Sequence, residues 1–166
     1  MDLEFDVTIE IPKGTRNKYV FDRRSGRIRL DRTLFTATQY PADYGYVEGT
    51  FGEDVDALDA LVLVQAPTFP GCLIRCRTIG MFRMSDEHGP TPKVLCVPTA
   101  DIRLSHVRDI ADLDPFYRLE IQHFFEVYKA VEPGKRVDVE GDQWAGHAEA
   151  QAQVRHAYER VGRSLG

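Results

Sequence analysis

The residues of this chain best suited to chemistry are three carboxylates, Asp54, Asp56 and Asp59, within the six-residue segment DVDALD. An apolar run of strand length, residues 60–64, follows them directly. Carboxylates at this spacing repel one another unless cations or hydrogen-bond donors offset their charge. An acidic turn before a buried strand suits Mg²⁺, which prefers oxygen ligands and often bridges to substrate phosphates. The alternative interpretation is a solvated acidic turn that binds nothing.

Further polar residues with chemical potential lie in turns or at the ends of predicted strands. They are the acidic residues Glu10, Asp86 and Glu87, the basic residues Lys18, Arg32, Lys93 and Lys129, and the tyrosines Tyr40, Tyr44, Tyr46 and Tyr128. Together they supply what phosphoryl transfer to water requires. Carboxylates hold metal ions, lysine and arginine neutralise phosphate oxygens, tyrosine hydroxyls donate to them, and a spare carboxylate takes a proton from water.

The length and charge of the chain limit its class. At 166 residues we expect one domain spanning residues 1–166, with an ordinary globular composition. The net charge of −5 argues against a nucleic acid or an anionic membrane as a partner. The first residues lack the pattern of a signal peptide, and no apolar run has the length of a membrane span. Cys72, Cys76 and Cys96 form no C-x-x-C pair, so we expect reduced thiols in the core of a cytoplasmic protein.

The first hundred residues predict short strands and no helix. Residues 4–11 alternate strictly between apolar and polar side chains, and Ser25 and Gly26 mark the turn of a hairpin. The predicted strands cover residues 4–11, 18–22, 27–30, 60–66, 72–82 and 94–97. Turns are expected around 69–71 and 88–92. An antiparallel barrel or sandwich is the simplest arrangement of such strands.

The last third of the chain predicts two helices, which makes the class α+β. Asp114 is suited to cap a helix that has Pro115 at its first position, and Gly134 closes that segment. A second helix is predicted from about residue 142 to 162. The apolar positions expected to face the core are Tyr117, Ile121, Phe124, Tyr128 and Val131 in the first, and Trp144, Ala148, Ala152, Ala157 and Val161 in the second.

Short motifs that contain the chemically suited residues follow one another along nearly the whole chain. They are residues 9–12 (IEIP), 17–19 (NKY), 30–32 (LDR), 40–46 (YPADYGY), 54–59 (DVDALD), 86–87 (DE), 93 with 97–98 (K, VP) and 123–129 (HFFEVYK). In this order and over one domain, the chain resembles the soluble family I inorganic pyrophosphatases of the bacterial type.

The resemblance implies an OB-like five-stranded antiparallel β-barrel with additional short strands and two C-terminal α-helices. It implies Mg²⁺-dependent hydrolysis of inorganic pyrophosphate to two phosphates by a metal-activated water, in a homo-hexamer. His88 places an imidazole beside Asp86 and would favour Mn²⁺ or Zn²⁺ as an alternative metal. The other interpretation of His88 is an exposed turn residue.

The resemblance also assigns roles to individual residues. Asp56 matches the carboxylate that takes a proton from a metal-bridged water. Four further carboxylates match metal ligands: Glu10, Asp54, Asp59 and Asp86. Six residues match groups that bind phosphate: Lys18, Arg32, Tyr44, Lys93, Tyr128 and Lys129.

Four positions depart from the usual pattern of the family, namely Val20, Val55, Ala57 and Thr91. Ala57 replaces a proline and lets the loop keep more conformational entropy when unfolded, at a cost of ~0.5–1 kcal/mol. Val20 and Thr91 each stand where the family carries a carboxylate. A threonine hydroxyl is a far weaker Mg²⁺ ligand than a carboxylate. The loss of such a ligand is expected to cost at least ~10–100-fold in metal affinity or activity.

Two functions therefore remain open from the sequence. The first is a working Mg²⁺-dependent pyrophosphatase, in which Val20 and Thr91 can lower the activity or alter the metal preference. The alternative is a diverged paralogue with weak or lost activity on pyrophosphate that acts on or binds another phosphorylated ligand. An OB-fold nucleic-acid binder would need a basic groove with exposed aromatic residues, which the acidic composition opposes. A calcium-binding EF-hand loop starting at Asp54 would need Gly and Glu where the chain has Asp59 and Gln65.

Overall fold

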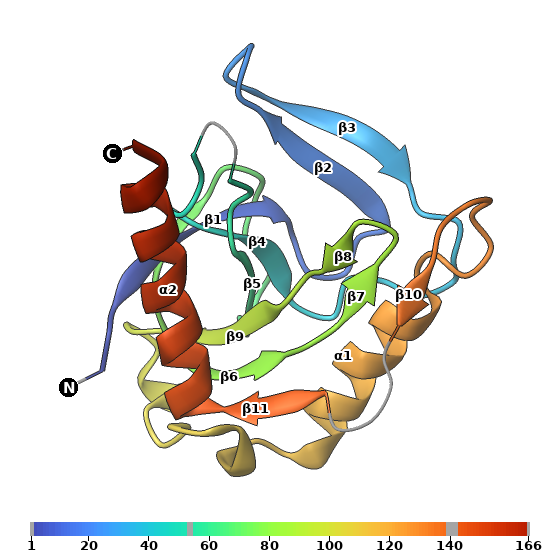
Figure 1. Cartoon of the computed structure of the whole chain (residues 1–166). Coiled ribbons are helices and arrows are strands. Elements are labelled where there is room, and N and C mark those ends of the chain that lie inside the picture. Colours follow the sequence, from blue (N-terminus) through green and yellow to red (C-terminus); the bar gives the residue numbers. More distant parts are fainter. Residues whose placement is uncertain (1, 53–54, 139–142, 166) are drawn as a thin grey trace.

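The computed structural model describes residues 2–52, 55–138 and 143–165. Five strands form a closed barrel in which each strand pairs with the next and the last pairs with the first (Figure 1). In spatial order they are β1 (Phe5–Ile11), β4 (Asp43–Val47), β5 (Asp59–Val62), β9 (Lys93–Pro98) and β6 (Leu73–Phe82). The expected OB-like five-stranded barrel with two later helices is confirmed.

One pairing in the barrel differs from the all-antiparallel expectation, because β5 and β9 run parallel. The long β6 strand and a short hairpin lie between them in sequence, so the chain returns and enters β9 in the direction of β5. In the parallel register Asp59 pairs with Lys93, and these are the first residues of their strands. The pairing therefore places an acidic and a basic residue side by side at one end of the barrel.

The remaining strands lie outside the barrel. The predicted hairpin is formed by β2 (Asn17–Asp22) and β3 (Arg27–Thr33), which turn through Gly26 in a left-handed conformation, φ 71°. A small second sheet combines β7 (Ser85–Asp86), β8 (Gly89–Pro90) and β10 (Val137–Asp138). The segment 88–92, predicted as a turn, thus includes part of a tight hairpin. The tyrosine-rich segment contains β4, which the sequence patterns did not single out.

The first helix begins as predicted. In α1 (Pro115–Val127), the Asp114 side chain caps the helix by accepting a hydrogen bond from the Phe116 N–H at 3.0 Å. Its middle residues face the core, but Tyr117 and Val131 are exposed. Val131 lies beyond the end of the helix, so the predicted apolar stripe is wrong at both its ends. Two short 3₁₀ turns, Ile102–Leu104 and Ile110–Asp112, precede α1.

The second helix starts later than predicted. Residues 139–142 lie outside the described part, and Trp144 belongs to the strand β11 (Trp144–Gly146), which pairs with the edge of β6. The helix α2 runs over His147–Leu165. Its first N–H donates to Asp109 Oδ1, at 3.0 Å, from a segment far away in sequence. Because this cap sets the start of the helix, the predicted positions Ala148 and Ala152 are exposed.

The buried face of α2 instead consists of Ala150, Val154 and Ala157, and only Ala157 was among the predicted positions. Strand alternation divides the core between the two helices. In β5 and β9, alternate side chains belong to the core cluster that contains α1 and to the cluster that contains α2. Cys76 and Cys96 are buried free thiols, as expected, whereas Cys72 is half-buried. Within the described residues, neither helix combines the length and apolar character needed to cross a bilayer.

Gly45 in β4 marks a close approach of two barrel strands and yields a stability prediction. A Cβ at this position would lie 1.8 Å from the Thr8 backbone oxygen of β1. We expect Gly45→Ala to lower the free energy of unfolding by ~1–3 kcal/mol or more, because the barrel cannot open to admit a methyl group. Urea unfolding followed by circular dichroism measures this change.

Gly162→Ala on α2 is the matched control. A Cβ there meets no atom within 4 Å, and the residue is helical. Its stability should be unchanged or higher, since alanine favours helix by about 1 kcal/mol over glycine. Equal midpoints for the two variants would contradict the close approach.

Candidate active site

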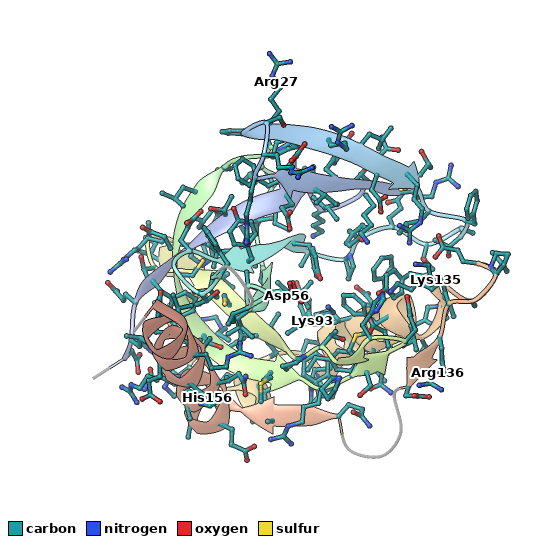
Figure 2. The ribbon with its side chains drawn as sticks, turned by 45° about the horizontal axis from the view of Figure 1, so that its top comes forward. Arg27, Asp56, Lys93, Lys135, Arg136 and His156 are labelled. Carbon is teal, nitrogen blue, oxygen red and sulfur yellow. The ribbon has the colours of Figure 1, made fainter. Side chains whose placement is uncertain are left out.

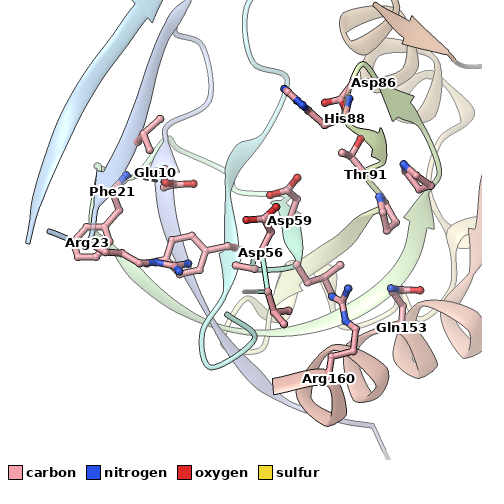
Figure 3. A pocket seen from close by; sticks show the side chains of 17 residues that line it. Glu10, Phe21, Arg23, Asp56, Asp59, Asp86, His88, Thr91, Gln153 and Arg160 are labelled. Carbon is pink, nitrogen blue, oxygen red and sulfur yellow. Dashed lines mark hydrogen bonds between the residues drawn. The ribbon is translucent and has the colours of Figure 1, made fainter. Parts of the chain in front are cut away.

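A pocket of about 690 Å³ opens at the barrel end where β5 and β9 begin (Figure 3). Four carboxylates from separate segments line it: Glu10 of β1, Asp56 of the loop before β5, Asp59 of β5 and Asp86 of β7. The strands and turns that carry them are spread over eighty residues of sequence. They line the same pocket because the barrel closes and brings these segments together. Figure 2 shows Asp56 and Lys93 toward the middle of the molecule, whereas Arg27 projects from the tip of the β2–β3 hairpin.

Lys93 joins this pocket to the aromatic core. Its Nζ lies 3.0 Å from Asp59 Oδ2 and donates to the Tyr44 hydroxyl at 3.0 Å. The Lys93 side chain is almost fully buried, and its Nζ lies 5.1 Å from the ring centroids of Tyr44 and Phe125. A buried ammonium is stable only when its charge is matched, and Asp59 and the two aromatic faces do this. Burial and the nearby Asp59 charge raise the pKa of Tyr44, so its hydroxyl stays protonated.

Glu10 and Asp56 differ in their surroundings. Glu10 accepts a hydrogen bond from the Phe21 N–H at 2.9 Å. Burial raises the pKa of Glu10, and repulsion from Asp59 acts in the same direction. Asp56 is exposed in the pocket and makes no hydrogen bond or ion pair with any residue in the described ranges. Its carboxylate oxygens are therefore not occupied by contacts with the described residues.

Asp86 and Glu87 form ion pairs with lysines of the segment that follows α1. The buried Lys129 lies 3.5 Å from Asp86 Oδ2 and 3.8 Å from Glu87 Oε1, and Lys135 lies 3.4 Å from the same Glu87 oxygen. Glu87 has a pKa lowered to about 2, by its own backbone N–H, by the Arg136 N–H and by the lysines. It therefore remains a carboxylate that positions the lysine.

Arg32 is held by the carboxylate of Glu132, a residue that lies outside the sequence motifs. The guanidinium donates through Nε and Nη2 to the two carboxylate oxygens of Glu132, the second bond being 3.0 Å long. This bidentate bond lowers the pKa of the buried Glu132. Lys18 lies 3.5 Å from Asp31, and its pKa is lowered by burial and then by the Arg32 charge. Lys18 and Arg32 are paired across β2 and β3, so the two cations of this hairpin lie side by side.

None of the six predicted phosphate-binding residues lines the pocket itself. Two of them, Lys93 and Lys129, are joined to it through ion pairs with Asp59 and Asp86. Burial, and then the charges of Asp86 and Asp59, raise the pKa of Tyr128, so its hydroxyl stays protonated. The structure therefore separates a carboxylate-rich side from an adjoining cationic side.

The structure also locates the positions that depart from the family pattern. All four line the pocket: Val20, Val55, Ala57 and Thr91. Val20 and Thr91, which stand where the family pattern has a carboxylate, are therefore part of the pocket wall. Thr91 Oγ1 is buried there with no hydrogen-bond partner. His88 lines the pocket with a mostly exposed side chain, and its Nε2 lies 3.7 Å from Glu87 Oε1.

The pocket lining differs from the predicted set of site residues. Asp54, predicted to bind metal, lies outside the described residues. Tyr46 of the motif 40–46 lines the pocket, and so do three polar residues that the sequence motifs did not indicate, Arg23, Gln153 and Arg160. Gln153 and Arg160 belong to α2, and no local signal in that helix marks them as site residues.

The carboxylate side has the chemistry of a site for a hard divalent cation. Its donors are carboxylate oxygens, which Mg²⁺ and Mn²⁺ accept. In residues 2–52, 55–138 and 143–165, no three His, Cys, Asp or Glu side chains already gather around one point. Burial, and to a smaller extent repulsion from Asp59, raises the pKa of Glu10, and a cation bound beside it would favour the carboxylate form. The residues present therefore fit a metal ion.

Comparison with known proteins gives a consistent result. The family model described as inorganic pyrophosphatase matches residues 7–162. The chain is 65% identical over 158 residues to the inorganic pyrophosphatase of Streptomyces coelicolor, covering 95% of this chain and 96% of that protein. It is 50% identical to the inorganic pyrophosphatase of Leifsonia xyli, with 93% of each chain covered.

A solved structure extends the match to three dimensions. The crystal structure of inorganic pyrophosphatase from Thermus thermophilus aligns with a TM-score of 0.90 and 43% identity, over 96% of this chain and 91% of that chain. Nothing in these comparisons supports the alternative of a paralogue with another ligand. The chain therefore belongs to the inorganic pyrophosphatase family of metal-dependent enzymes, and it hydrolyses inorganic pyrophosphate.

Proposed function

We propose that the metal of this pyrophosphatase is Mg²⁺, bound on the carboxylate side of the pocket by Glu10, Asp54, Asp59 and Asp86. The observation that carries the proposal is the meeting of this carboxylate side with the cationic side at the Asp59–Lys93 pair. Bound there, Mg²⁺ would supply Lewis acidity, which polarises phosphoryl oxygens and lowers the pKa of coordinated water.

The chain's own residues would then divide the remaining work. Asp56, which has no partner among the described residues, takes the proton of the attacking water as general base. The cations Lys93, Lys129, Arg32 and Lys18 bind phosphate oxygens and disperse the charge that develops on the leaving phosphate. Tyr44 and Tyr128, whose raised pKa values keep them protonated, donate hydrogen bonds to the same oxygens. Glu132 and Glu87 position Arg32 and Lys129.

The proposal extends to the assembly and location of the enzyme. Large apolar side chains on α1 are exposed in the single chain, Phe116 to 68% and Leu119 to 57%. Such residues suit burial between subunits, which supports a homo-hexamer. Three free cysteines suit a reducing compartment and support the cytoplasm.

The direct test is phosphate release from pyrophosphate by the purified protein, with Mg²⁺ and then with Mn²⁺. We expect release that stops when EDTA removes the metal and that is faster with Mg²⁺. Faster release with Mn²⁺ or Zn²⁺ would contradict the choice of metal and would direct attention to His88. Size-exclusion chromatography with light scattering tests the hexamer.

Asp56→Asn tests the general base. We expect kcat to fall by about 100–10,000-fold, because the amide cannot take a proton from water. The oligomer and the unfolding midpoint should remain those of the wild type, since Asp56 makes no bond to the described residues. Glu4→Gln, which removes an exposed carboxylate away from the pocket, is the control for charge. Full activity of the Asp56 variant would show that another group takes the proton.

Glu10→Gln tests the carboxylate side as a metal site. Glutamine still accepts the Phe21 hydrogen bond but carries no buried charge, so the metal-free variant should be at least as stable as the wild type at pH 7. The raised pKa of Glu10 means that the wild type gains stability as the pH falls through that pKa, and the variant should lose this gain.

Thermal unfolding with EDTA or Mg²⁺ completes that test. A ligand at a hundred times its Kd stabilises by about 2.7 kcal/mol. We expect Mg²⁺ to stabilise the wild type and to stabilise Glu10→Gln much less. Equal stabilisation of both proteins would exclude Glu10 from the metal site.

Thr91→Asp, alone or with Val20→Glu, tests the departures on the pocket wall. A carboxylate at either position adds an oxygen ligand facing the pocket, and we expect activity with Mg²⁺ to rise by ~10–100-fold. Thr91→Asn has nearly the same shape without the charge and should bring no gain. Unchanged turnover in the aspartate variant would mean that Thr91 does not limit this enzyme.

A further inference from the structure

The helix α2 contributes a second face that its packing does not use. While Ala150, Val154 and Ala157 pack on the barrel, Gln153 and Arg160 lie seven residues apart and so on one side of the helix. Both line the active-site pocket. Figure 3 shows the Arg160 side chain rising from the helix into the pocket, on the side of Asp56. An arginine thus enters the carboxylate side from the C-terminal helix.

Arg160 has no partner for its charge within the described ranges. No hydrogen bond or ion pair joins it to these residues, and its Nε is buried without an acceptor. A buried donor that lacks a partner costs about 1–3 kcal/mol, so native proteins rarely keep one unless a ligand completes it. The Nε of Arg118 on α1 shares this feature, but Arg160 also lines the pocket, so a ligand that enters the pocket can supply its acceptor.

Three of the four described acidic residues that line the pocket are already engaged in other contacts, and the fourth, Asp56, makes no ion pair with Arg160. Asp59 lies at 3.0 Å from Lys93, Asp86 at 3.5 Å from Lys129, and Glu10 accepts from the Phe21 N–H. Val20 and Thr91 add no charge to the wall that could pair with the guanidinium. The buried Thr91 Oγ1, also without a partner, is a second polar atom of the same pocket awaiting a ligand.

An anion with several oxygens matches these groups. A guanidinium binds phosphate oxygens through two parallel N–H bonds, with more geometric selectivity than an ammonium. Lys93, Lys129 and Arg32 lie on the cationic side, whereas Arg160 reaches the pocket from α2. A substrate with two phosphate groups can therefore place one group on each side.

We propose that Arg160 is a substrate-binding residue of this enzyme, which holds one phosphate group of pyrophosphate from α2 while the lysines and Arg32 hold the other. The inference rests on the proposed function, because that proposal assigns the other phosphate group to the lysines and Arg32. It adds the C-terminal helix to the site as a determinant of selectivity for diphosphates over monophosphates.

Isothermal titration calorimetry with methylenediphosphonate, a diphosphate that cannot be hydrolysed, tests the contact without turnover. It is carried out on the full chain with EDTA and again with Mg²⁺, and inorganic phosphate is titrated for comparison. We expect Arg160→Gln to weaken methylenediphosphonate binding by about 10–100-fold, the range for a hydrogen bond to a charged group. Binding of inorganic phosphate should change by less than threefold. In steady-state kinetics the KM for pyrophosphate should rise more than kcat falls.

Arg155→Gln is the matched control, because Arg155 is an exposed arginine of the same helix that does not line the pocket. It should bind and turn over like the wild type. Arg160→Met keeps the aliphatic stem and replaces the glutamine variant if circular dichroism shows that the latter is unfolded. Methylenediphosphonate affinity and KM in the folded Arg160 variant equal to those of Arg155→Gln would overturn the inference.

The two proposals fail in different ways. Loss of the Arg160 effect alone, with metal-dependent hydrolysis by the wild type intact, overturns the role of Arg160 and leaves the proposed function standing. Equal weakening of methylenediphosphonate and phosphate binding would also overturn it, since Arg160 would then not distinguish the second phosphate group. A wild type without hydrolysis would overturn the proposed function, and the binding series would still decide on Arg160.

Discussion

The site depends on the ion pair between Asp59 and Lys93, which exists because β5 and β9 are parallel neighbours that begin at the same end of the barrel. In this register the first residue of each strand is charged and the following residues are buried. The barrel therefore holds a carboxylate and an ammonium at a fixed distance of 3.0 Å at the edge of its core. Each charge makes the burial of the other tolerable, and loss of either would leave an uncompensated charge.

From this pair the site extends in two directions of opposite charge. Carboxylates of β1, the loop before β5 and β7 line the pocket on one side, and cations of β2–β3 and the end of α1 lie on the other. Two carboxylates that do not line the pocket, the buried Glu132 and the half-buried Glu87, hold these cations in place. This arrangement keeps long, flexible side chains in one geometry before the substrate binds, which reduces the entropy that binding must overcome.

Local patterns predicted much of this architecture, and their failures have identifiable causes. The alternation of β1 and the Asp114 cap of α1 are local features, so the sequence indicated them correctly. The start of α2 is set instead by Asp109, and the strand identity of Trp144 by pairing with β6. Neither partner is close in sequence. Asp43 is part of a predicted motif, but its side chain accepts hydrogen bonds from the backbone N–H groups of Lys13 and Thr68. It therefore holds two loops in place and does not line the pocket.

The sequence by itself determined the family, the barrel class and the types of residue that the reaction needs, because these depend on residue identity, order and short-range periodicity. Only the tertiary structure decided which carboxylates share a pocket, which of the cations are already paired, and that Arg160 of the last helix faces the same volume. The physical reason is that strand closure and helix docking join segments separated by many residues. Their contacts depend on packing of the whole barrel, which no local window of sequence contains.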